Sequence, residues 1–210
     1  MIYLSGCLPA KPELQQLLQS NNCGILLTPF SQRSRPDDKW VWAADNGCFS
    51  SRWDHRTWSS WLESRPEPHT ALFAVVPDVV CDPIGTLERW HEHYEYVAGL
   101  EYSPAFVLQD NATDQTIPWD ELGCLFIGGS TKYKLSDDAR RFIRKAKDLG
   151  KWVHMGRVNS KRRISLAYDW GCDSVDGTYV AFGPDVNTPK LVRMLDNGTQ
   201  PVFDLATNEK

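Results

Sequence analysis

Eight short apolar runs, separated by amphipathic segments, recur along the whole chain and limit the folds that it can adopt. The runs cover residues 2–4, 24–27, 41–44, 71–76, 105–108, 124–127, 152–154 and 174–175. Most are continuously apolar rather than alternating, which is typical of strands buried on both faces of a parallel sheet. Strands that alternate with helices indicate a parallel α/β fold, and eight such units are enough to close a barrel. We therefore expect residues 1–210 to form one compact, single-domain (β/α)₈ barrel.

The segments between the runs carry helix start and stop signals. Asp54, Asp82 and Ser136 each precede a helical pattern and are residue types that cap helix N-termini. Gly150 follows another such pattern, at a position where glycine commonly ends a helix. A last helix is expected over residues 188–198. The connection 110–120 has little helical pattern, so we expect one or two of the barrel helices to be missing.

From the composition and the scattered cysteines we expect a globular protein of the cytoplasm. Its 41% apolar and 24% charged residues are ordinary for that class. No stretch reaches the roughly 18 consecutive apolar residues of a membrane span, and the N-terminal pattern does not lead us to expect a signal peptide. Its six cysteines have no metal-binding spacing, which favours reduced thiols, and we expect no metal and no cofactor. A viral protein of this kind would act in the host cytoplasm.

Positive charge is concentrated in residues 132–163, where twelve Lys or Arg stand against three Asp. Such a run can be a helix face exposed to solvent, or it can be a surface that binds a polyanion. Both interpretations stay open at this point. If the run binds nucleic acid, the phosphate-contacting candidates are Lys132, Lys134, Arg157, Lys161, Arg162 and Arg163.

Polar residues recur where successive runs end. In a parallel barrel, the carboxyl ends of the strands form the active-site face. Asp45, Asp78 and Asp176 fall at such ends, as does Gln109. Paired carboxylates are typical of acid–base and nucleophilic work at a glycosidic carbon. Aspartates at a barrel mouth also bind Mg²⁺, and the spacing leaves that alternative open.

Several segments, in the same order, resemble motifs of the tRNA-guanine transglycosylases. Asp45-Asn46-Gly47-Cys48-Phe49 is similar to the family's D-S-G-G-F-Q, and Gln109 falls where the family has V-Q-G. Phe126-Ile127-Gly128-Gly129 resembles A-I-G-G-L, and His154-Met155-Gly156-Arg157 resembles L-M-G-V-G. Gly171-Cys172-Asp173-Ser174-Val175-Asp176 is similar to G-[IV]-D-M-F-D. The shared order extends from about residue 40 to residue 180.

The resemblance implies a division of roles. Asp176 would be the nucleophile that forms a covalent glycosyl–enzyme intermediate, and Asp45 would handle the protons of the leaving and entering bases. Asp78 would bind the Watson–Crick edge of the base. The other substrate-binding residues implied are Phe49, Gln109, Gly128, Gly129, Met155 and Gly156.

The chain departs from the family in its zinc site. The C-x-C-x-x-C motif and distant His that hold zinc in the family are absent, and the P-T-R segment after the nucleophile is replaced by Gly177-Thr178-Tyr179. Because the zinc region helps the family to engage tRNA, the resemblance favours the reduced branch of phages and bacteria that inserts 7-deazaguanines into DNA. The expected partners are then nucleic acid, DNA before tRNA, and a free 7-deazapurine. The oligomeric state is open, including a partner subunit in place of the missing region.

Two other functions fit the same barrel. The first is a nucleoside hydrolase or a metal-dependent enzyme acting on a small molecule. The second is a base-binding protein without catalytic activity. His154, inside a strand, is expected to be a hydrogen-bonded core residue rather than part of a site.

Overall fold

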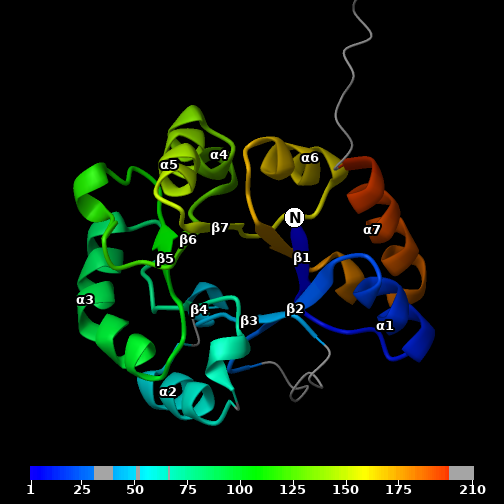
Figure 1. Ribbon diagram of the computed structural model, residues 1–210, viewed down its shortest axis with the longest axis horizontal. Helices are drawn as coiled ribbons and strands as arrows, with labels where there is room; N and C mark the ends of the chain where they lie inside the picture. The colour runs from blue at the N-terminus through cyan, green and yellow to red at the C-terminus, as the bar shows by residue number, and fades with distance from the viewer. Residues whose placement is uncertain (31–39, 51–52, 66, 199–210) are drawn as a thin grey trace, which may run out of the picture.

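The chain folds into a closed barrel of eight parallel strands in the order β1 to β8, which confirms the predicted fold (Figure 1). The computed structural model describes residues 1–30, 40–50, 53–65 and 67–198. The strands are β1 (Ile2–Ser5), β2 (Cys23–Leu27), β3 (Trp42–Ala44), β4 (Ala74–Val75), β5 (Pro104–Leu108), β6 (Cys124–Ile127), β7 (Trp152–Met155) and β8 (Ser174–Gly177). Pairing of β8 with β1, with Asp176 opposite Leu4, closes the barrel.

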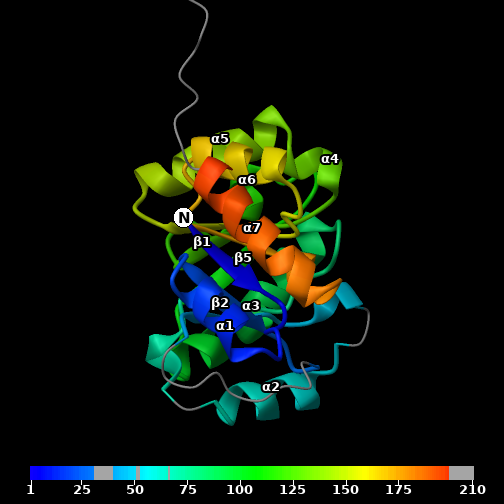
Figure 2. The ribbon, with the colours of Figure 1, turned by 90° about the vertical axis from the view of Figure 1, so that its right-hand side faces the viewer.

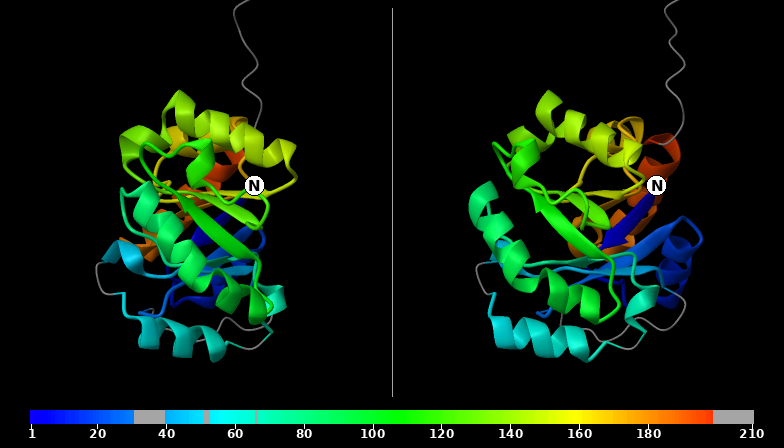
Figure 3. Two further views of the ribbon diagram at one scale, coloured as in Figure 1. Left: turned by 90° about the vertical axis from the view of Figure 1, so that its left-hand side faces the viewer. Right: turned by 60° about the vertical axis from the view of Figure 1, so that its left-hand side comes forward.

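Helices form a ring outside the strands, as Figures 1 and 2 show. The described helices are α1 (Pro12–Gln19), α2 (His55–Glu63), α3 (Pro83–Gly99), α4 (Thr131–Lys134), α5 (Asp137–Asp148), α6 (Lys161–Asp169) and α7 (Pro184–Gly198). Between β5 and β6 the only helical turn is the 3-10 segment Asp114–Thr116, as expected from the weak pattern there (Figure 3). No described helix is long and apolar enough to cross a membrane.

The helix boundaries follow the sequence signals. The side chains of Asp54, Asp82 and Ser136 each accept a hydrogen bond from an N–H in the first turn of α2, α3 and α5. Gly150, beyond the end of α5, has a φ of 68°, which a glycine adopts without strain. The last helix begins at Pro184, a turn before the predicted start.

Two layers of apolar side chains form the core. One lies between the strands and the helix ring, and the other fills the barrel interior. The interior layer consists of Leu4, Leu26, Ala43, Phe73, Val75, Ala105, Val107 and Cys124. Because side chains alternate along a strand, these residues fix which later positions face the barrel axis. Cys23, Cys48, Cys124 and Cys172 are buried thiols, whereas Cys81 is exposed.

Candidate active site

A cavity of about 290 Å³ opens at the carboxyl ends of the strands, the end of the barrel at which such folds place their active sites. The sequence-predicted residues that line it are Asp45, Phe49, Asp78, Gln109, Gly128, Gly129, Gly156, Arg157 and Asp176. Leu26, Val75, Val80, Val107 and Phe126 supply apolar wall. The structure therefore brings all three predicted aspartates into one pocket, close to the lower end of the size range of small-molecule sites, roughly 300 Å³.

The two-residue period of the strands explains which groups reach this cavity. Asp45 lies two residues beyond the inward-facing Ala43, and Gln109 lies two beyond Val107. Met155 has the opposite phase: it is buried in the layer between strands and helices and does not line the cavity. The prediction that Met155 packs against a base is therefore wrong.

Asp78 is held by two side-chain amides. Asn46 Nδ2 donates to Asp78 Oδ1 at 2.9 Å, and Gln109 Nε2 donates to Asp78 Oδ2 at 2.7 Å. The Gln109 amide is itself oriented, because its Oε1 accepts from the backbone N–H of Cys81 at 2.9 Å. Burial raises the pKa of Asp78, and the bonds from Asn46 and Gln109 oppose that shift. Cys48 also donates to this carboxylate, and three donors leave one of its roughly four acceptor sites for a ligand.

Asp45 is the most perturbed carboxyl group of the cavity. Burial, followed by the charges of Asp176 and Asp78, raises its pKa to about 7. The backbone N–H groups of Asn46 and Gly47 oppose the shift. A carboxyl group with this pKa is populated in both protonation states near neutral pH, as a residue that gives and takes protons must be.

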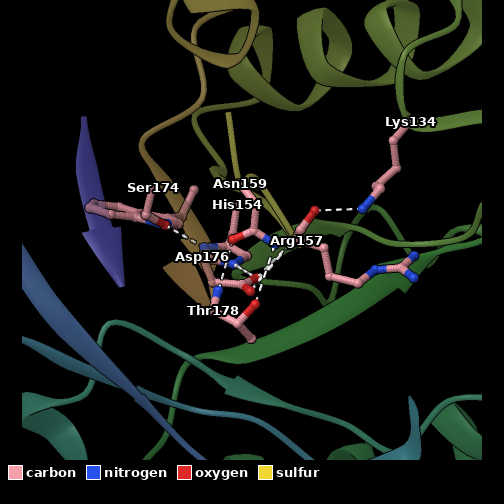
Figure 4. Close-up of polar contacts among 9 residues, drawn as sticks. Lys134, His154, Arg157, Asn159, Ser174, Asp176 and Thr178 are labelled. Carbon is pink, nitrogen blue, oxygen red and sulfur yellow. Dashed lines mark hydrogen bonds and ion pairs between the residues drawn. The ribbon is translucent and has the colours of Figure 1, made fainter. Parts of the chain in front are cut away.

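Asp176 accepts hydrogen bonds from two sides (Figure 4). His154 Nε2 lies 3.0 Å from Asp176 Oδ2, and the backbone N–H of Arg157 lies 3.2 Å from both carboxylate oxygens. Arg157 has a φ of 59°, which is uncommon outside glycine. The Asp176 side chain is 14% exposed, so the carboxylate still faces the cavity.

Arg157 also bridges the mouth of the cavity. Its guanidinium carbon lies 4.3 Å from the centre of the Phe49 ring, and its Nη2 donates to the carbonyl oxygen of Gly129. Asp110 fixes the loop that carries this carbonyl by accepting 2.6 Å hydrogen bonds from the Ser130 N–H and hydroxyl. A flat cation and an aromatic ring thus form one edge of the opening.

The predicted basic candidates divide into two groups. Lys132, Lys161 and Arg162 are exposed and Arg163 is partly exposed, on the helices that follow β6 and β7. Lys134 is only 3% exposed, and its Nζ donates to the Gly156 carbonyl oxygen at 2.5 Å. The prediction that Lys134 grips phosphate is therefore wrong: α4 turns its side chain into the protein.

Exposed apolar residues are found in the segments that follow the strands at this end of the barrel. Six of the large ones follow the carboxyl end of a strand: Phe30, Phe49, Val80, Ile84, Phe182 and Val186. Phe182 is the most exposed of them, at 78%. Exposed apolar groups clustered at one end of a protein are typical of a surface that contacts a partner.

Three residues near Asp176 have contacts that the sequence did not predict. His154 is fully buried, as the core interpretation predicts, yet it also contacts Asp176. Ser174 hydrogen-bonds to the ring of His154, and Lys134 hydrogen-bonds to the backbone carbonyl of Gly156. His154 lies two residues before Gly156, and Ser174 lies two residues before Asp176. This spacing, which puts strand residues on the same face, is the sequence signal that could have identified them. Among the described residues, no three His, Cys, Asp or Glu side chains are grouped so that they could hold a metal ion.

Comparison with known proteins supports the fold. No family model and no curated protein matches the chain. The Amycolatopsis orientalis BexX/CysO complex is similar over 97% of this chain and 93% of that one, at 16% identity and a TM-score of 0.59. Tryptophan synthase from M. tuberculosis, in its aminoacrylate- and BRD0059-bound form, is similar over 95% and 91%, at 12% identity and a TM-score of 0.57. The native KDPGal structure is similar over 94% and 92%, at 12% identity and a TM-score of 0.55. None of these three is a tRNA-guanine transglycosylase, and at such identities the likeness establishes the barrel alone.

Proposed function

We propose that the protein is a base-exchanging transglycosylase that acts on nucleic acid, with DNA as the preferred acceptor. The observation that carries this proposal is the convergence of Asp45, Asp78 and Asp176 on one cavity, in three different environments. Paired carboxylates at one cavity are typical of acid–base and nucleophilic roles at a glycosidic carbon, and the raised pKa of Asp45, about 7, suits the proton-handling role. The proposed roles agree with those that the sequence resemblance implies.

In the first half-reaction, an Asp176 oxygen attacks C1′ of the target nucleotide. The C1′–N bond to the base breaks, and its electron pair returns to the base, which takes a proton from Asp45. In the second half-reaction, the incoming base gives its N–H proton to the Asp45 carboxylate and attacks C1′, which releases Asp176. The net change is one base for another, without oxidation or reduction, through a covalent glycosyl–aspartate.

Asp78 and Gln109 supply the means to select the base. The remaining acceptor site of the Asp78 carboxylate suits an N–H group on the Watson–Crick edge of guanine or a 7-deazaguanine. Gln109 Nε2 has a second hydrogen beyond the one given to Asp78, and it suits the neighbouring carbonyl oxygen. The apolar walls formed by Val75, Val107 and Phe126 fit the faces of a flat base.

A macromolecular acceptor is supported by the surface around the cavity. Exposed basic side chains on α4 and α6 stand on one side of the opening. Exposed apolar side chains, Phe182 among them, follow the carboxyl ends of strands at the same end of the barrel. Cationic groups neutralise phosphates while aromatic rings stack on bases, and single strands are bound by that combination.

Trapping the covalent intermediate tests the proposal. The purified protein is incubated with a guanine-containing DNA oligonucleotide, or with tRNA, and then denatured and analysed by gel and by mass. We expect a DNA adduct that Asp176→Ala abolishes and that added 7-deazaguanine consumes. Asp169→Ala, which removes an exposed aspartate on α6, is the matched control and should retain the adduct.

Other outcomes would overturn the proposal in distinct ways. An adduct that survives Asp176→Ala excludes the assigned nucleophile. Tight binding of a 7-deazaguanine without turnover on either nucleic acid identifies a binding protein. Cleavage of free nucleosides without an adduct on DNA or tRNA identifies a hydrolase.

A further inference from the structure

A chain of hydrogen bonds runs through the barrel interior to Asp176 (Figure 4). Trp152 Nε1 donates to Ser174 Oγ at 2.9 Å. Ser174 Oγ lies 2.8 Å from His154 Nδ1, and His154 Nε2 lies 3.0 Å from Asp176 Oδ2. The links come from β7 and β8, which are adjacent and parallel, with His154 in register with Ser174. Both nitrogens of one imidazole are thus occupied, with the carboxylate of the active site on one of them.

The chemistry of its first member gives this chain a direction. An indole N–H can only donate, so Ser174 Oγ must accept from Trp152. Ser174 is fully buried, and the only other hydrogen-bond partner of its hydroxyl found in the described residues is His154. A buried hydroxyl hydrogen left without an acceptor is costly, so the Ser174 O–H donates to His154 Nδ1. Nδ1 is then an acceptor, and the ring proton lies on Nε2, from which it is donated to Asp176.

The imidazole also has little freedom to turn. Its ring centre lies 4.5 Å from that of Phe126 and 5.0 Å from that of Phe73, and the residue is fully buried. The Arg157 N–H holds the carboxylate from a second side. Asp176 is therefore fixed by donors behind and beside it, while its remaining lone pairs face the cavity.

We propose that His154 is a positioning residue: a neutral imidazole with its proton on Nε2, oriented by Ser174 and Trp152, that aims the Asp176 carboxylate at C1′. This inference rests on the proposed function, because Asp176 needs to be aimed at C1′ only if it is the nucleophile. His154 itself does not line the cavity. A neutral donor orients the carboxylate without the full ion pair that an imidazolium would form, and it therefore lowers the nucleophilicity of Asp176 less than an imidazolium would. Displacement of a reacting group by about 1 Å is enough to lower a rate about 100-fold.

The first test reads the tautomer directly and does not depend on activity. Protein labelled with ¹⁵N-histidine contains five such rings, and the His154→Gln variant identifies the resonances of His154. We expect a protonated Nε2 and an unprotonated Nδ1 at neutral pH. A proton on Nδ1, alone or together with one on Nε2, would overturn the inference even if the protein forms the adduct.

The second test separates positioning from simple stability. In single-turnover adduct formation, His154→Phe, which keeps a flat buried ring but no donor, should lower the rate about 100-fold. His154→Gln, which restores an N–H near Asp176, should recover most of that rate. The Kd for the free base should change less than threefold in both variants, because the base contacts Asp78 and Gln109. The exposed His69→Gln is the matched control and should leave both values unchanged.

Each result of the second test has one meaning. Equal rates for wild type and His154→Phe, or equal losses in the Phe and Gln variants, contradict a positioning role. If His154→Phe does not fold, Ser174→Ala supplies the comparison, and an unchanged adduct rate in that variant contradicts the role of the chain. If wild-type protein forms no adduct at all, the proposed function fails, while the NMR result still decides the state of His154.

Discussion

Asp45, which follows β3, and Asp176, on β8, line the same cavity and are electrostatically coupled. Burial is the largest cause of the raised pKa of Asp45, about 7, and the negative charge of Asp176 is the next. This coupling changes during the proposed reaction, because Asp176 loses its charge when it bonds to C1′. The same event that consumes the nucleophile therefore makes Asp45 a stronger acid, ready to release the proton to the leaving base.

The two half-reactions should depend on pH in opposite ways. Adduct formation needs Asp45 protonated, so its rate should fall about tenfold for each pH unit above about 7. Consumption of the adduct by added base needs the Asp45 carboxylate, so its rate should fall as the pH drops below the pKa of Asp45 in the adduct. Single-turnover rates for each half-reaction, from pH 5.5 to 8.5, measure both limbs. Parallel pH profiles for the two steps would contradict the role of Asp45.

The same carboxyl group should make stability depend on pH. Between its ordinary pKa of 3.8 and about 7, Asp45 keeps a proton in the folded protein that the unfolded chain has lost. The free energy of unfolding should therefore fall as pH rises through that window, by up to about 1.4 kcal/mol per pH unit. Asp45→Asn removes this dependence, so the variant should gain stability over wild type from pH 4 to 7. Urea unfolding at several pH values gives the difference, and a constant difference would show that Asp45 is not perturbed.

Asp78→Asn should weaken binding of the free base and leave the fold intact. The change replaces one carboxylate oxygen by a donor at the position where guanine presents N–H groups, and only one of the two amides, Asn46 or Gln109, keeps an acceptor. Loss of a hydrogen bond to a charged group corresponds to about 1.5–3 kcal/mol, or roughly a tenfold to hundredfold rise in Kd. Calorimetry with guanine and a 7-deazaguanine measures the effect. Asp82→Asn, which keeps a capping side chain on α3, is the control.

The exposed basic residues should set the salt dependence of nucleic-acid binding. Lys161→Ala and Arg162→Ala should each weaken binding to any sequence and reduce the slope of log K against log salt by about 1. Lys151→Ala is the matched control, because Lys151 precedes β7 and so lies at the opposite end of the barrel. Fluorescence anisotropy from 50 to 300 mM salt gives the slopes. An equal change for Lys151→Ala would place the nucleic acid elsewhere.

The strands and most of the site could be predicted because they depend on local patterns. Continuous apolar runs mark buried parallel strands, and Asp45, Gln109 and Asp176 stand out as polar residues where those runs stop. The run at 174–175 was predicted too short because Asp176, although polar, continues β8 and faces the barrel mouth. Closure of the barrel then brings strand ends far apart in sequence to one cavity.

The wrong predictions, for Met155 and Lys134, concern the direction in which a side chain points. The residue type alone does not determine that direction. Met155 lies between the inward positions His154 and Gly156, so the alternation of the strand turns it toward the helices. Lys134 belongs to a charged segment, and only the short helix α4, capped by Ser130, shows that its side chain points inward. The contact between His154 and Asp176 likewise depends on the register of β7 with β8.

Lys134 makes a last prediction about stability. Burial, followed by the charges of Arg157 and Arg163, lowers its pKa from 10.5 to about 8, against the opposing charge of Asp176. Between pH 8 and 10.5 the unfolded chain therefore carries a proton that the folded protein has released. The contribution of Lys134 to the free energy of unfolding should then rise with pH through that window.

The Lys134→Met variant isolates this contribution, since buried cysteines and tyrosines with raised pKa values, such as Cys23 and Tyr102, act in the opposite sense in both proteins. Wild type should gain stability relative to the variant as the pH rises from 8 to 10. Lys132→Met, on the same helix but exposed, is the matched control and should show a flat difference. Because Lys134 Nζ holds the Gly156 carbonyl beside Asp176, the variant should also slow adduct formation while the salt slope of DNA binding stays unchanged. A reduced salt slope in Lys134→Met would instead mean that its ammonium group reaches the nucleic acid.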